Sequence, residues 1–135
     1  MKRAKYDASG GPISVKVSCA PTCSGSYDIL LWEAGKNQVV REWSGNFLNA
    51  DDDEFSLDKP IGFHNGRLLE AMIVVAVPAD VGPSTVTMTV LQDGRDIERE
   101  TVAVAPTPWQ VVDLFIQLDG GVAVEPRTSG SITLA

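Results

Sequence analysis

The chain contains few residues whose types and spacing could support covalent or acid–base chemistry. His64 is its only histidine, and it stands beside Asn65-Gly66 in a predicted turn. The sequence has no Gly-x-Ser-x-Gly elbow, no phosphate-binding Gly-Lys-Ser/Thr loop and no His-Glu-x-x-His helix. We therefore expect a solvated loop histidine, and an enzyme ranks third among the functional hypotheses.

Oxygen-bearing side chains are densest in the run Asn49-Ala50-Asp51-Asp52-Asp53-Glu54. Calcium takes about six to eight oxygen ligands, often from loops, so the candidate ligands are Asn49, Asp51, Asp53 and Glu54. The run lacks the glycine that an EF-hand places at its sharp turn. A solvated acidic loop explains the same residues without a metal, and we favour that interpretation. No cofactor is therefore expected, and calcium is the alternative.

Two cysteines, Cys19 and Cys23, flank a segment that contains Pro21. A disulfide between them would close a very short loop and contribute about 2 kcal/mol on the loop-entropy model. Zinc would need further soft ligands that the single histidine cannot supply. A pair of inert thiols is slightly favoured, and the disulfide remains the alternative.

The tryptophans suggest a binding hypothesis that depends on the hairpin predicted over residues 27–43. The loop of this hairpin contains either an even or an odd number of residues. An even loop places four large side chains on one face: Leu30, Trp32, Val39 and Trp43. That face would then meet a partner or a ligand. An odd loop instead turns Trp43 toward Ile29 and Leu31, as a core residue. Trp109, at a strand start, is expected to cover the end of the core.

These residues must be positioned by strands, because no stretch long enough for a helix has apolar residues at the spacing of a helix. Short β-rich runs bounded by Gly, Pro, Asn and Asp recur instead. Strands are predicted over residues 13–18, 27–33, 38–43, 55–57, 68–77, 85–91, 95–104, 109–118 and 122–124, with a further edge strand or tail at 131–134. The fold class is therefore all-β, an antiparallel β-sandwich of roughly eight or nine strands.

Details of the later strands follow from their patterns. The apolar run 68–77 is predicted to be a central strand covered on both faces. Asp93-Gly94 predicts a tight hairpin turn, and a change of apolar parity predicts a bulge near Glu100-Thr101. The expected core residues include Ile73, Val75, Val86, Met88, Val90, Leu114 and Ile116. The segment 85–104 resembles the paired late strands of immunoglobulin-like bacterial sandwich modules, so the expected subtype is immunoglobulin-like or jelly-roll. No functional residue follows from that resemblance.

Length and charge bound the remaining possibilities. At 135 residues the chain predicts one domain over 13–135, preceded by a flexible leader over 1–12. The net charge of −7, with scattered Lys and Arg, argues against nucleic acid and against an anionic membrane surface. No apolar run is long enough to span a membrane, and the first residues lack a signal peptide's apolar stretch. A cytoplasmic location is expected, or a secreted or periplasmic one if the N-terminus was trimmed.

The leading functional hypothesis is a non-catalytic β-sandwich module that acts through protein–protein interaction or self-association. It follows from the missing reactive groups and from the apolar surplus in the 27–43 hairpin. The alternative is a ligand-binding sandwich, either calcium-dependent or carbohydrate-binding.

Overall fold

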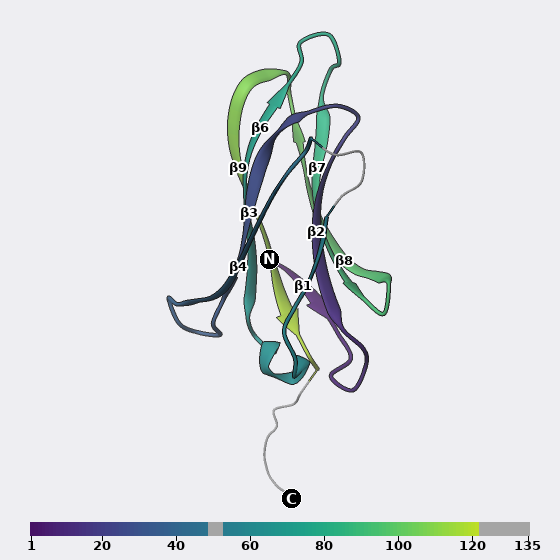
Figure 1. Cartoon of the computed structure of the whole chain (residues 1–135), viewed down its shortest axis with the longest axis vertical. Coiled ribbons are helices and arrows are strands. Elements are labelled where there is room, and N and C mark those ends of the chain that lie inside the picture. Colours follow the sequence, from purple (N-terminus) through teal and green to yellow (C-terminus); the bar gives the residue numbers. More distant parts are fainter. Residues whose placement is uncertain (49–52, 122–135) are drawn as a thin grey trace, which may run out of the picture.

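The computed structural model describes residues 1–48 and 53–121, which form two facing β-sheets with one short 3-10 helix, η1 (Figure 1). Its elements are β1 (Lys2–Lys5), β2 (Ile13–Ala20), β3 (Ser24–Trp32), β4 (Val39–Asn46), β5 (Glu54–Ser56), η1 (Ile61–His64), β6 (Leu68–Val77), β7 (Ser84–Gln92), β8 (Arg95–Val104) and β9 (Thr107–Asp119). The expected strands at 122–124 and 131–134 lie outside the described residues. The all-β sandwich predicted from sequence is confirmed.

The strands divide into a five-stranded sheet in the order β1-β9-β6-β3-β4 and a four-stranded sheet in the order β5-β2-β7-β8. The two sheets lie face to face and do not close into a barrel (Figure 1). Every neighbouring pair is antiparallel except β1 and β9, which run parallel. The sheets are therefore antiparallel, as the sequence predicts, except at this one edge.

The core lies between the sheets and is built by alternation, since successive side chains on a strand point to opposite faces. All seven residues expected in the core are buried: Ile73, Val75, Val86, Met88, Val90, Leu114 and Ile116. The Asp93-Gly94 turn is also confirmed. Both residues have positive φ, 54° and 76°, as the tight hairpin turn with the twist of its strands requires.

Two strand details differ from the prediction. β6 is central in its sheet, but only one face is covered: alternate residues are buried, while Met72 and Val74 are 42% and 40% exposed. The bulge in β8 lies at Ile97 rather than near Glu100, because Val90 pairs with Glu98 and Leu91 with Asp96. A change in the alternation of apolar residues indicates that a strand contains a bulge, but it locates the bulge only approximately.

The expected flexible leader is ordered in the structure. β1 pairs with β9, with Ala4 opposite Leu118, and both Ala4 and Tyr6 are buried. The following loop is held by the side-chain amide of Gln92. Gln92 accepts a hydrogen bond from the backbone N–H of Asp7 at 2.8 Å and donates to the carbonyl oxygens of Asp7 and Gly11 at 2.7 and 3.1 Å. β1 also contacts β8 of the other sheet, so it lies across the open side between the two layers (Figure 1).

Candidate functional site

The surface of the five-stranded sheet that points away from the core, here called the outer face, carries the candidate site. On β3, β6 and β9 the inward residues form the core, and the alternate residues form this outer face. In register, Trp32 lies beside Leu68 and Leu68 beside Gln117. Two rows further along, Asp28 lies beside Met72 and Met72 beside Asp113. No described element packs over this face.

One end of the outer face carries an exposed cluster of apolar residues, here called the apolar patch: Met72, Val74, Trp109 and Val111. Val74 and Val111 are direct partners on neighbouring strands, so their side chains lie side by side. Trp109 and Val111 are 63% and 66% exposed. The expectation that Trp109 covers the end of the core is therefore wrong.

Sequence reasoning missed this patch, although the signal was present. β6 and β9 are apolar at both parities, which means either that both faces are covered or that one face is an exposed apolar surface. The sequence prediction for residues 68–77 is the first alternative, and the structure shows the second.

The other end of the outer face contains an open cavity of about 620 Å³, here called the Trp32 groove. Its apolar lining comes from Trp32, Leu68 and Phe115, and its polar lining includes Glu70 and Gln117 from the same strands. The loop between β3 and β4 adds Lys36 and Asn37. The indole Nε1–H of Trp32 donates to Oε1 of Glu70 at 3.0 Å, which fixes the ring on the face of the sheet.

The predicted hairpin surface is only partly brought together. Leu30 and Trp32 are half-buried on the outer face, and Val39, directly opposite Trp32, is 39% exposed. Trp43 lies opposite Ile29 and is buried in the core, so its assignment to the binding surface is wrong. The reason is a bulge: Leu31 pairs with Arg41 and Trp32 with Val39, which leaves an extra residue in β4 and reverses its parity.

Carboxylates are distributed among the apolar side chains of the outer face. Alternation and register place Asp28 on β3, Glu42 on β4, Glu70 on β6 and Asp113 on β9 toward it. The outward residues of these four strands include no Lys or Arg. The edge strand β1 differs, because its register with β9 places Arg3 beside Gln117 and Lys5 beside Asp119. From β4 to β9 the face therefore combines apolar groups with negative charge, in keeping with the net charge of −7.

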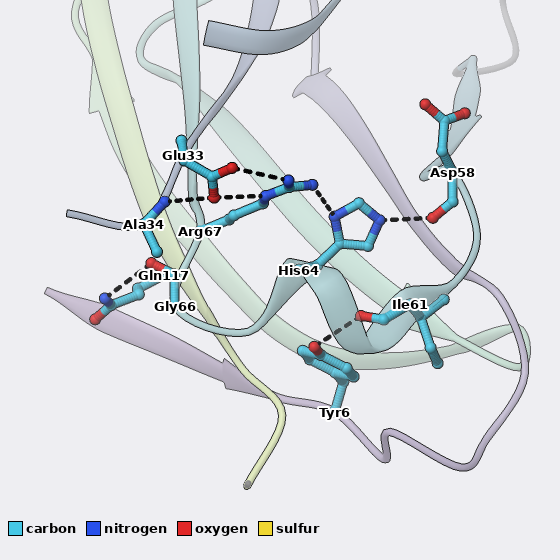
Figure 2. Close-up of polar contacts among 9 residues, drawn as sticks. All are labelled: Tyr6, Glu33, Ala34, Asp58, Ile61, His64, Gly66, Arg67 and Gln117. Atoms are coloured by element: carbon cyan, nitrogen blue, oxygen red, sulfur yellow. Dashed lines mark hydrogen bonds and ion pairs between the residues drawn. The ribbon is translucent and has the colours of Figure 1, made fainter. Parts of the chain in front are cut away.

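A network of polar contacts braces the loops at the end of the sheet next to the Trp32 groove (Figure 2). Arg67 donates from Nε and Nη2 to the two carboxylate oxygens of Glu33, at 3.0 Å each, a bidentate geometry that fixes both side chains. The backbone N–H of Ala34 donates to the same carboxylate at 2.9 Å. These hydrogen bonds to the charged form, led by that of Arg67, lower the pKa of Glu33 to about 2.

His64 belongs to this network and is buried, so the expectation of a solvated loop histidine is wrong. Arg67 can only donate, so its Nη1 donates to Nδ1 of His64 at 3.1 Å. The proton of the neutral ring is then on Nε2, which donates to the carbonyl oxygen of Asp58 at 2.6 Å. Burial lowers the pKa of His64. With both ring nitrogens hydrogen-bonded inside the fold, His64 joins η1 to the segments on either side of it, at Asp58 and Arg67.

The remaining sequence candidates have different outcomes. Asn49 and Asp51 lie outside the described residues. Oε2 of Glu54 accepts a hydrogen bond from the Ser14 hydroxyl at 2.7 Å. Within residues 1–48 and 53–121, no group of three or more His, Cys, Asp or Glu side chains could hold a metal ion. The calcium hypothesis and the solvated-loop hypothesis both stay predictions.

Cys19 and Cys23 form a disulfide in the structure, with Cα atoms 6.2 Å apart, so the slightly favoured interpretation of two inert thiols is wrong. The disulfide joins the end of β2 to the segment just before β3. It therefore fixes the connection between the two sheets.

A search for membrane-spanning helices and comparisons with known proteins give no information about function. Among the described residues there is no helix with the length and apolarity needed to cross a membrane. The sequence matches no protein-family model, and no curated protein or solved structure is detectably similar to the chain. The fold places the chain in the class of all-β sandwiches, and its function must be inferred from the surface of the molecule.

Proposed function

We propose that this chain is a non-catalytic β-sandwich module that binds another protein through its outer face. The observation that carries the proposal is the apolar patch, where Trp109 and Val111 are each more than 60% exposed and Val111 lies beside Val74 in register. Single exposed apolar residues are ordinary, but a contiguous apolar cluster on a soluble protein tends to mark an interaction site. Tryptophan is also the residue type most enriched among energetically dominant contacts.

The surroundings of the patch favour an unlike partner over a second copy. Met72 is flanked in register by the carboxylates of Asp28 and Asp113. Two copies docked face to face would bring these negative charges together, whereas a partner with Lys or Arg around an apolar centre would pair with them. The proposed partner is therefore a protein surface that is apolar at its centre and basic at its rim. The immunoglobulin-like or jelly-roll subtype also stays a prediction.

Two measurements test this function. Size-exclusion chromatography with light scattering separates self-association from hetero-association, and we expect a monomer at high concentration. Affinity capture with the wild-type chain should then retain a partner that the double variant Trp109→Ser/Val111→Ser loses. Salt should weaken the capture, because charged rims are screened.

Val39→Ser is the matched control, since Val39 is exposed on the same sheet but lies on the edge strand beside Trp32. It should capture the partner as well as the wild-type chain does. Equal capture by the double variant would rule out the apolar patch as the interface. A stable dimer broken by the double variant would show that the partner is a second copy.

A further inference from the structure

The Trp32 groove is a second candidate site, separate from the apolar patch. Leu68 in the groove and Val74 in the patch are six residues apart on β6, which is roughly 20 Å at the rise of an extended strand. The cavity of about 620 Å³ is within the size range of small-molecule sites, about 300–1,000 Å³. The groove is therefore large enough for a small ligand.

Hydrogen bonds hold Trp32 and Gln117 in place in the groove. Trp32 is fixed by its hydrogen bond to Glu70, and Phe115 lies directly beside Glu70 in register. Gln117 donates from its amide nitrogen to the carbonyl oxygen of Gly66 at 3.3 Å, which leaves the amide oxygen of Gln117 free of that bond (Figure 2). Held side chains lose little conformational entropy when a ligand binds.

The polar lining identifies the class of ligand. Glu70 and Lys36 carry opposite charges, and the other carboxylate of the lining, Glu33, is already paired with Arg67. The lining thus has no excess charge that would select an ion. The amides of Asn37 and Gln117 offer both donors and acceptors, as does the pair of Glu70 and Lys36.

We propose that the Trp32 groove binds a neutral carbohydrate. A sugar ring presents a face of C–H groups that packs on an indole or phenyl ring, and its edge carries hydroxyls that both donate and accept hydrogen bonds. Trp32 and Phe115 supply the apolar surfaces. Glu70, Gln117 and the loop residues Lys36 and Asn37 bind the hydroxyls.

The test is a glycan array that carries neutral, sialylated and sulfated oligosaccharides, probed with the full chain. We expect binding to neutral glycans, and calorimetry with the best-bound neutral oligosaccharide then compares variants. Trp32→Ala should weaken binding by about tenfold or more, as loss of a central aromatic contact does. Glu70→Gln keeps an oxygen for the Trp32 N–H and should change neutral-sugar affinity only a few-fold.

Two further variants keep the test decisive if Trp32→Ala disturbs folding. Asn37→Trp places a bulky ring at the mouth of the groove from an exposed loop and should abolish binding without touching the core. Trp109→Ala, on the apolar patch, should leave sugar binding unchanged. Binding to no neutral glycan, binding to charged glycans alone, or binding that survives Asn37→Trp would overturn the proposal.

Discussion

Substitution of Trp43 and of Trp109 by alanine tests the assignment of one tryptophan to the core and the other to the surface. Trp43 is 9% exposed. The ring centroids of Trp43 and Phe55 are 6.4 Å apart. The guanidinium carbon of Arg41 lies over the Trp43 ring, 5.3 Å from its centroid. Trp109 is 63% exposed on the outer face. The two tryptophans should therefore differ sharply in what they contribute to folding.

For Trp43→Ala we expect a loss of about 3–5 kcal/mol in the free energy of unfolding, from lost transfer free energy plus the cavity left behind. The contact with Arg41 adds about 0.5–1 kcal/mol, the value for a cation–π pair at an exposed site. For a chain of this size, that loss lowers the melting temperature by roughly 10–20 °C. Trp109→Ala should stay within about 0.5 kcal/mol of the wild type, since substitutions at exposed positions rarely do more.

Urea unfolding followed by far-UV circular dichroism is the suitable assay, because fluorescence would change with the loss of a tryptophan in either variant. The urea dependence of the unfolding free energy should be unchanged, so that the midpoints report stability directly. If Trp43→Ala costs less than about 1 kcal/mol, or if Trp109→Ala costs as much as Trp43→Ala, the assignment of core and outer face in the five-stranded sheet is wrong.

Three further predictions follow from particular contacts. Ile116→Ala should lower the unfolding free energy by about 2–5 kcal/mol in chemical denaturation, since Ile116 is fully buried. Gly25 has a φ of 138°, and a Cβ there would meet the carbonyl oxygen of Val74, so Gly25→Ala should cost about 1–3 kcal/mol in the same assay. The lowered pKa of His64 means that the unfolded chain takes up a proton first; stability should fall as pH drops below about 6.5, and melting curves of His64→Gln should lack this component.

The strands were predictable from sequence because alternation is a local property. The Thr/Val alternation of residues 85–91 predicts that Val86, Met88 and Val90 share a buried face, and β7 buries all three. The opposite face is exposed only at Thr85, since Thr89 and Leu91 are also buried. The Asp93-Gly94 turn is equally local, because its positive φ angles suit these two residue types. Local rules therefore predicted the fold class and most of the core.

Features that depend on distant partners were not predictable in the same way. β1 reads as a charged tetrapeptide, Lys-Arg-Ala-Lys, and becomes a strand only because the edge of β9 is available to it. The parity of Trp43 depends on a bulge in β4, which a count of loop residues cannot locate. For β6, an apolar run is the same in sequence whether its second face is covered or exposed. The candidate site arises from these three features, so only Leu30, Trp32 and Val39 were anticipated on the outer face.

The position of β9 between β1 and β6 has a consequence for how the chain is made. β1 is synthesised before the other described strands, but its only partner within the five-stranded sheet is among the last described segments to be synthesised. At about 5–20 residues per second, β1 waits roughly 6–23 s for the residues that pair with it. Between its own synthesis and that of β9, β6 also lacks a neighbour on one side, and its edge is open to pairing with other nascent chains. Because Lys2, Arg3 and Lys5 are charged, β1 stays solvated until β9 has been synthesised.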